Sequence, residues 1–158
     1  MFQCTALATR GNTKRTKMAV GIRMDILDEL RSFKIPRNSL LQKVKAVLAL
    51  QQIKDVQPEI LHALPLMEDP IQLATMRILN KLATYPNLCG GTFLLILASC
   101  GMYQRTLNNG LCPLSTSAFT TLAVVRCSMS NFQGGKLFSD RALSLLARFD
   151  SKSDLSRT

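Results

Sequence analysis

Hydrophobic residues recur every three or four positions along most of the chain, which is the spacing of an amphipathic α-helix. The clearest case is the segment 70–84, where the residues expected to face inward are Leu73, Met76, Ile78, Leu79 and Leu82. Alternation of apolar and polar residues, which would indicate a half-buried strand, never runs for more than four residues. The pattern therefore predicts an all-α fold with about seven helices. The expected helices cover residues 24–33, 38–56, 58–64, 70–84, 93–104, 115–130 and 139–150.

Capping and breaking residues set the expected helix ends. Asp69 followed by Pro70 is a strong start signal, because Asp accepts hydrogen bonds from free backbone N–H groups and Pro suits the first helical position. Asn38 or Ser39 can cap the helix over 38–56 in the same way. The run 133–135, Gln-Gly-Gly, is expected to separate the last two helices, since Gly is unfavourable inside a helix.

The apolar stripes predict which side chains enter the core. In the segment 38–56 the residues expected to face inward are Leu40, Leu41, Val44, Val47 and Leu48, with Ile53 as a further candidate. The residues expected on the solvent side of that segment are Lys43, Lys45 and Lys54. In the helix 115–130 the expected core residues are Phe119, Leu122, Val125 and Met129. In the last helix they are Leu143, Leu145, Leu146 and Phe149.

A chain of 158 residues with 47% hydrophobic residues is long enough for one domain with a substantial core. We expect a single compact domain over residues 1–158. It would have an N-lobe over about 1–86, a C-lobe over about 87–150 and a polar tail over 151–158. The joint between the lobes is expected near residues 85–91, where Tyr85-Pro86 ends one helix and Gly90-Gly91 precedes the next.

The chain carries 20 Lys and Arg residues against 10 Asp and Glu, a net charge of +10. Such an excess favours a polyanionic partner, either a nucleic acid or an anionic membrane surface. No carboxylate occurs between Pro70 and Ser139, so this stretch cannot hold a paired-acid catalytic site. Its basic residues are expected to keep the surface potential positive.

The strongest basic cluster lies near the N-terminus, where residues 5–18 contain no acid. Lysine and arginine supply the Coulomb attraction for phosphates, and Thr and Asn side chains can donate hydrogen bonds to phosphate oxygens. The same composition is also typical of a solvated tail, a nuclear localisation signal or a transit peptide. The candidate RNA-binding residues are Arg10, Asn12, Lys14, Arg15 and Lys17.

Residues for catalysis or metal binding are sparse. The single histidine, His62, lies in a short apolar segment with no Ser or Cys close in sequence and no acid expected to orient it, so we expect a structural role. The five cysteines lack metal-ligand spacing and are expected to be free thiols. We expect no enzyme activity, no cofactor, no metal and no transmembrane segment. The longest apolar run, residues 92–100, is far below the roughly 18 residues of a membrane span.

Four blocks of the sequence together resemble the nucleocapsid proteins of phleboviruses and tenuiviruses, the phenuivirus group. Residues 6–18, ALATRGNTKRTKM, are similar to the family signature A-L-T-R-G-N-K … K-M, with an extra Ala8 and with Thr13 in place of Lys. Residues 56–65, then Tyr85-Pro86 with Phe93, then residues 138–149 resemble later family blocks in the same order. The family's N-terminal helical arm has no counterpart before Met1, and its usual Trp after the second block is replaced by residues 67–69.

The resemblance implies a two-lobed helical protein that encapsidates single-stranded RNA without sequence specificity, with the bases in a groove between the lobes. Arg10, Asn12 and Lys17 match RNA-contacting positions of the family, and Lys14 and Arg15 are the local basic residues beside them. The implied partners are single-stranded RNA, a second copy of the chain and the viral polymerase. The implied location is the virion and the ribonucleoprotein of the host cytoplasm.

Two other functions remain open from the residues alone. One is a helical viral matrix or accessory protein that docks on an anionic membrane or a host protein through the acid-free region 70–139. The other is a basic helical domain with protein partners only.

Overall fold

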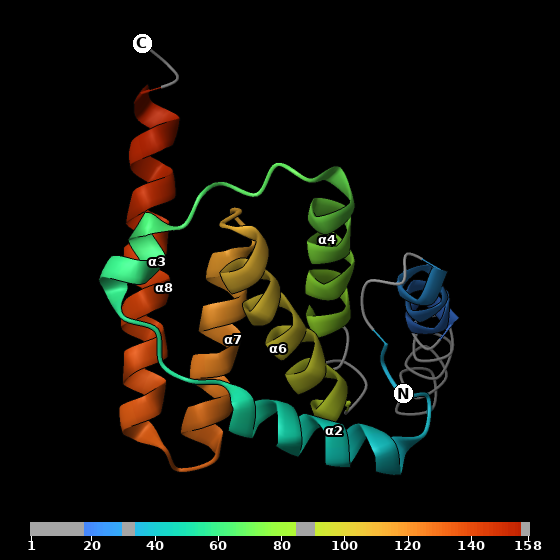
Figure 1. Ribbon diagram of the computed structural model, residues 1–158. Helices are drawn as coiled ribbons and strands as arrows, with labels where there is room; N and C mark the ends of the chain where they lie inside the picture. Colours follow the sequence, from blue (N-terminus) through green and yellow to red (C-terminus); the bar gives the residue numbers. More distant parts are fainter. Residues whose placement is uncertain (1–17, 30–33, 85–90, 156–158) are drawn as a thin grey trace, which may run out of the picture.

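The structure consists of α-helices joined by short connections (Figure 1). It is a computed structural model, and it describes residues 18–29, 34–84 and 91–155, with side chains as far as residue 149. Within these ranges residues 18–29 are helical, six further helices follow, and no strand forms. The prediction of an all-α fold with about seven helices is confirmed. The further helices are α2 (Ser39–Gln52), α3 (Pro58–Ala63), α4 (Pro70–Thr84), α6 (Thr92–Asn109), α7 (Ser115–Ser128) and α8 (Phe132–Leu155).

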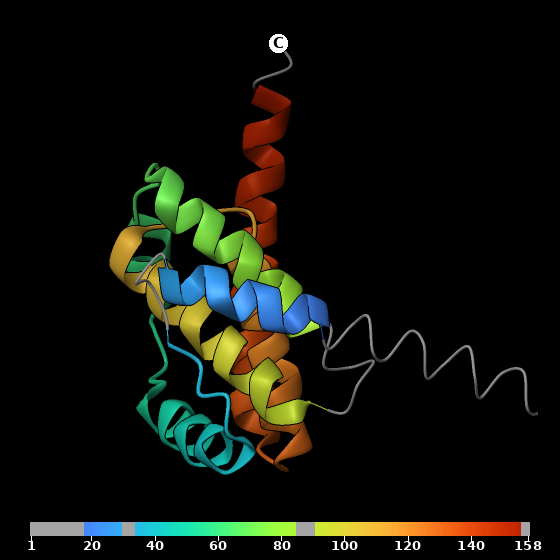
Figure 2. The same cartoon turned by 90° about the vertical axis from the view of Figure 1, so that its right-hand side faces the viewer.

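Helix α6 lies at the centre of the molecule and packs against α2, α4 and α7 (Figures 1 and 2). Every residue from Ile96 to Tyr103 is buried, as expected for a segment that is apolar on all sides. The helix continues past its expected end at Gln104 to Asn109. It stops at Gly110, whose positive φ of 100° is a conformation that terminates helices and that glycine adopts without strain.

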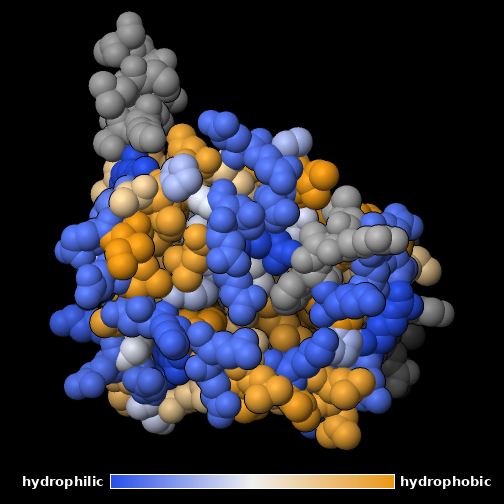
Figure 3. Space-filling model, viewed as in Figure 1, coloured by the Kyte–Doolittle hydropathy of each residue, from blue (hydrophilic) through white to orange (hydrophobic). Residues whose placement is uncertain are grey.

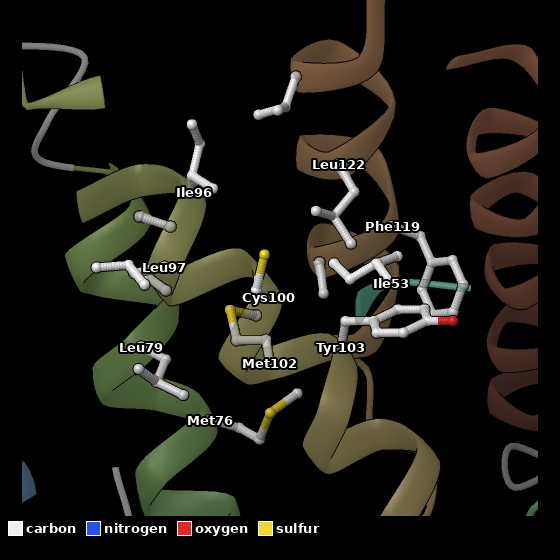
Figure 4. Close-up of a cluster of buried hydrophobic side chains, with 14 of the residues drawn as sticks. Ile53, Met76, Leu79, Ile96, Leu97, Cys100, Met102, Tyr103, Phe119 and Leu122 are labelled. Atoms are coloured by element: carbon white, nitrogen blue, oxygen red, sulfur yellow. The ribbon is translucent and has the colours of Figure 1, made fainter. Parts of the chain in front are cut away.

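The core around α6 combines aliphatic, sulfur-containing and aromatic side chains from several helices (Figure 4). Tyr103 of α6 meets Phe119 of α7 edge to face, with ring centroids 5.3 Å apart. It also meets Phe138 of α8, with centroids 5.9 Å apart. Met76 and Leu79 of α4 are completely buried on the other side of α6. Fully burying side chains of this size stabilises the fold by about 1.5–3 kcal/mol each, so this cluster fixes the positions of four helices.

The turn between α7 and α8 corrects the predicted boundary between the last two helices. Helix α8 begins at Phe132 and includes both Gly134 and Gly135, where the sequence had indicated a break. The real break is at Ser130, which has a φ of 60°, and at Asn131, whose side chain accepts a hydrogen bond from the Gly134 N–H at 2.9 Å. The expected start at Ser139 was therefore wrong, because a capping Asn outside the helix outweighs the low helix propensity of two glycines.

Gly135 has a packing function in this pair of helices. A Cβ atom placed on it would lie 2.2 Å from the Cys127 Sγ and 3.2 Å from the Ala123 carbonyl oxygen. The lack of a side chain lets α8 approach α7 closely at this point. Met129, which was expected in the core, caps the end of α7 and is 59% exposed.

Helix α2 corrects the predicted orientation of an apolar stripe. It packs on α6 through Ala46 and Leu50, which are buried, and Ile53 just beyond its end is buried as well. Ile53 was among the residues expected to face inward, but the other five are more than half exposed. They are Leu40, Leu41, Val44, Val47 and Leu48. Because α2 is apolar on two opposite sides, periodicity alone could not indicate which side packs. The alanine on the inner side allows a close approach of the two helices.

The capping predictions for α2 and α4 are confirmed. The Asn38 side chain accepts a hydrogen bond from the Leu40 N–H at 2.9 Å, and the Asp69 side chain accepts one from the Ile71 N–H at 2.8 Å. Pro70 is the first residue of α4. Three of the predicted core residues of α4 are fully buried and two are half-buried: Met76, Leu79 and Leu82, and Leu73 and Ile78.

The chain from α2 to α3 is tied to α7 and α8 by arginines. Arg126 of α7 donates to the Leu50 and Ile53 carbonyls at 3.2 and 3.4 Å. On α8, Arg141 donates to the Val56 carbonyl at 2.9 Å, and Arg148 donates to the carbonyls at the end of α3, including that of His62 at 2.8 Å. The last carbonyls of α2 and α3 lack intrahelical partners, and cations from other helices satisfy them.

The predicted domain boundaries can be compared with the structure at the C-terminal tail but not at the joint between the lobes. Helix α8 continues to Leu155, so the expected polar tail over 151–158 is helical for its first five residues, 151–155. The end of α8 extends beyond the other helices (Figures 1 and 2). The expected joint between lobes falls on residues 85–90, outside the described residues. The division into an N-lobe and a C-lobe stays a prediction.

Candidate nucleic-acid interface

The five residues that the sequence singled out for RNA binding lie outside the described part of the chain, which begins at Met18. The structure therefore neither groups nor separates Arg10, Asn12, Lys14, Arg15 and Lys17. The candidate interface that can be built from coordinates is formed by other basic residues.

A second acid-free basic segment surrounds α2. No carboxylate occurs between Glu29 and Asp55. All the described Lys and Arg side chains of this stretch are exposed, and they are Lys34, Arg37, Lys43, Lys45 and Lys54. Arg37 forms an ion pair with Asp25 on the exposed surface, and the Lys43 ammonium lies 5.6 Å from the centre of the Phe93 ring. The other lysines have no ion pair with the described carboxylates.

Lys34 and Lys45 line a hollow of about 280 Å³ between α2, α6 and the segment before α2. Its polar lining is completed by the carboxamides of Gln52 and Gln104, and its apolar lining includes Leu48. No Asp or Glu is among the described residues that form the wall. The hollow therefore combines two ammonium groups, two amide donors and an aliphatic surface, the chemistry that a sugar–phosphate strand requires of a site that does not read its sequence.

Local structure holds both lysines in place. Lys34 precedes Ile35, which is buried, and the Gln42 side chain donates to the Pro36 carbonyl at 2.6 Å, which fixes the segment against α2. Lys45 precedes Ala46, which is completely buried against the core. The backbones of both lysines are thus anchored by their neighbours while their ammonium groups reach solvent.

Sequence reasoning had placed Lys45 on the solvent side of its helix, which is correct, but had not singled out Lys34 or Lys45 as a site. The absence of acids over residues 30–54 was the available signal. It could not identify the hollow, because Gln104 comes from α6, far along the chain.

The acid-free region 70–139 is less basic at its surface than its composition suggested. Arg105 is buried, its pKa is lowered by desolvation, and it donates to the Gly101 carbonyl at 3.2 Å. Arg126 is half-buried and caps the end of α2. The exposed cations of this region are Arg77 and Lys81 on α4 and Lys136 on α8. Two of its five basic residues therefore serve the fold.

His62 has a partner that the sequence could not indicate. Its Nε2 forms a hydrogen bond with the Ser144 Oγ of α8, and its own ring is exposed. A Ser–His pair acts in catalysis when an acid orients the imidazole and donors await the oxyanion. Within the described residues no carboxylate bonds to His62, and the neighbouring Arg148 is occupied with carbonyls of α3. The contact thus joins α3 to α8, which agrees with the structural role expected for His62.

The described cysteines are free thiols in different environments. Burial raises the pKa of Cys100 to about 12, so this thiol is protonated and unreactive at neutral pH. Cys112 is buried and Cys127 is exposed. No group of three or more His, Cys, Asp and Glu side chains in the described ranges could hold a metal ion.

Comparisons of the chain with protein-family models, with curated proteins and with solved structures found no match. None of the described helices combines the length and the hydrophobicity that a membrane-spanning helix needs.

Proposed function

We propose that this protein binds single-stranded RNA without sequence specificity and coats it, as a viral nucleocapsid-type protein does. The observation that carries the proposal is the hollow lined by Lys34, Lys45, Gln52 and Gln104, whose described wall residues include no carboxylate. The net charge of +10 and the resemblance of four sequence blocks to phenuivirus nucleocapsid proteins support it. A second copy of the chain, the viral polymerase and a location in virions and cytoplasmic ribonucleoprotein belong to the same proposal.

The composition of the hollow favours contacts with the RNA backbone over contacts with base edges. Lysine ammonium groups neutralise phosphates and release their counterions, which gives affinity without sequence information. Gln52 and Gln104 can donate hydrogen bonds to phosphate or ribose oxygens. The aliphatic side chains Leu48 and Leu97 offer an apolar surface for a base or a sugar. In this proposal Arg10, Asn12, Lys14, Arg15 and Lys17 add further phosphate contacts.

The test is fluorescence anisotropy with short single-stranded RNAs of unrelated sequence at several salt concentrations. The protein is first freed of nucleic acid, which is checked by absorbance at 260 nm. Replacing Lys34 and Lys45 by Gln should weaken binding to all sequences alike. It should also make the log–log salt dependence shallower by about 1.4, since each phosphate contact on a single strand contributes about 0.7.

The matched control is Arg77→Gln with Lys81→Gln, which removes the same charge from the exposed face of α4. Its salt dependence should stay close to that of the parent. If both pairs reduce affinity and slope equally, the hollow is not the binding site. Reversing Arg10, Lys14, Arg15 and Lys17 to Glu tests the N-terminal contribution, and unchanged binding of that variant would exclude it.

A further inference from the structure

Helix α2 presents a continuous aliphatic surface on the side opposite its packing face. Leu40, Leu41, Val44, Val47 and Leu48 are between 51% and 68% exposed, while Ala46 and Leu50 on the other side are buried. Residues at this spacing lie along one side of a helix. Figure 3 shows hydrophobic residues along the lower edge of the molecule, where α2 lies in the same view. We name these five residues the outer face of α2.

Lysines flank this face on both sides. Successive residues of an α-helix are turned by about 100°, so Lys43 and Lys45 project to opposite sides of Val44 at the centre of the face. Both are exposed, and α2 contains no acidic residue. The outer face of α2 is thus an aliphatic strip with a positive charge along each border.

The position and size of the outer face of α2 indicate which kind of partner can bind it. The outer face belongs to a single helix that lies at the periphery of the molecule in two perpendicular views (Figures 1 and 2). Five aliphatic residues are far fewer than the roughly 20–30 residues that each partner contributes to a stable protein–protein interface. Pairing with α2 of a second copy would also bring lysines of the same sign together. A peripheral helix with an aliphatic strip and lysine borders is suited to lie in the plane of a membrane interface.

We propose that the outer face of α2 docks on an anionic lipid surface. The aliphatic side chains of the face enter the region between headgroups and acyl chains. Lys43 and Lys45 extend along the border, with their methylene groups on apolar surface and their ammonium groups near lipid phosphates or carboxylates. This surface differs from the region 70–139 that composition had suggested for membrane docking. It shares Lys45 and Leu48 with the hollow proposed for RNA, and its other residues, Leu40, Leu41, Lys43, Val44 and Val47, do not line that hollow.

The experiment is co-sedimentation of RNA-free full-length protein with vesicles. One set contains phosphatidylcholine alone, and the other contains about one-third phosphatidylserine. The protein should bind the anionic vesicles and much less to the neutral ones. The variant Leu41→Gln/Val44→Gln/Val47→Gln, which leaves Leu48 of the hollow unchanged, should bind the anionic vesicles about tenfold more weakly or less, because the apolar contacts are lost while the charge is kept.

The matched control is Val124→Gln/Leu143→Gln/Leu146→Gln, which changes three similarly exposed aliphatic residues on α7 and α8. Its vesicle binding should remain within about twofold of the parent, and circular dichroism should show that both variants keep their helices. The proposal is overturned if the α2 variant binds like the parent, if the control loses as much, or if binding does not depend on phosphatidylserine.

Two further measurements separate other partners. Sedimentation equilibrium without lipid should give the same mass for the parent and the α2 variant. A parent dimer that the α2 variant converts to a monomer would assign the face to a second copy and overturn the proposal. RNA affinity of the α2 variant should equal that of the parent, so that loss of lipid binding and failure of the RNA proposal are distinguishable.

Discussion

Two glycines of this chain are placed where a side chain would collide with another part of the fold. Gly135 allows α8 to pass close to Cys127 of α7. Gly110 ends α6 with a positive φ, and a Cβ there would lie 2.5 Å from the Pro65 carbonyl oxygen. That oxygen accepts a hydrogen bond from the Leu111 N–H at 2.8 Å, and the Leu111 carbonyl accepts one from Met67 at 2.8 Å. Gly110 therefore lets the segment before α4 join the segment before α7.

Gly110→Ala should lower the free energy of unfolding by about 2 kcal/mol or more, because an alanine is strained at this φ and its Cβ meets backbone. Urea denaturation followed by circular dichroism measures the change. Gly21→Ala is the control, since Gly21 is in a helix with open space around it. This control should be neutral or stabilising, by up to about 1 kcal/mol. Equal stability of the Gly110→Ala variant and the parent would show that the contact between residues 65–67 and 110–112 is not required.

At the scale of elements, helix α3 illustrates how little of its stability is local. It has six residues, and only Leu61 among them is fully buried. An isolated helix of this length does not persist in water. Its end is held from α8, where Arg148 donates to the Leu61, His62 and Leu64 carbonyls at 3.5, 2.8 and 3.2 Å. The contact between His62 and Ser144 adds a second link. Helix α3 thus depends on α8 for its termination.

Replacing Arg148 by Met keeps much of the aliphatic stem and removes the donors. The variant should lose about 1–3 kcal/mol of stability, the cost of leaving carbonyls without charged donors. Amide hydrogen exchange should accelerate more in α3 than in α4, which would show that the loss of stability is local to α3. Arg77→Met is the control, because Arg77 is exposed on α4. Uniform acceleration of exchange over the whole protein would contradict a local capping role.

At the scale of the whole molecule, some basic side chains stabilise the fold and others are exposed on the surface. Arg105, Arg126, Arg141 and Arg148 donate to backbone carbonyls, and Arg141 also approaches the carboxylate of Asp55 at 3.7 Å. The exposed cations of the described residues include the lysines around α2, Arg77 and Lys81 on α4, and Lys136 on α8. The basic excess therefore overstates the charge that a polyanion meets.

Stability should fall in alkaline solution because two buried groups resist ionisation. Burial raises the pKa of Cys100 to about 12 from its ordinary 9.0. Burial and then the Asp55 carboxylate raise the pKa of Tyr103 to about 12 from 10.0. Above pH 9 the unfolded chain loses these protons while the folded chain keeps them until about pH 12. The stabilisation is therefore complete below pH 9 and is lost as the pH rises toward 12.

For Cys100 alone the loss should reach about 2 kcal/mol near pH 10.5. Urea denaturation at pH 8 and at about pH 10.5 measures it, and Cys100→Ala should show a smaller decline. A pH-independent midpoint over this interval would mean that neither group stays protonated in the folded state.

Most helices and their caps could be predicted from local chemistry alone. Asn38 and Asp69 cap the helices that follow them, and the uniformly apolar residues 93–102 predicted a buried helix, because such signals depend only on neighbouring residues. The side of each helix that packs against the core could not be predicted in the same way. Helix α2 is apolar on two sides, and the choice between them depends on what α6 presents. Likewise, Gly134 and Gly135 predicted a helix break from the sequence alone. In the structure both lie within α8, and Gly135 packs against α7.

For the candidate site too, the sequence predicted one part and only the tertiary structure decided the other. The excess of basic residues and the acid-free stretches are properties of the sequence, and they favour a polyanionic partner whatever the fold. Which cations remain exposed was decided only by tertiary structure, because Arg105 of α6 is buried in the core and Arg126 and Arg148 donate to carbonyls at the ends of α2 and α3. The hollow beside Lys34 and Lys45 likewise exists only where α2 crosses α6, since residues distant in sequence must meet to form a wall.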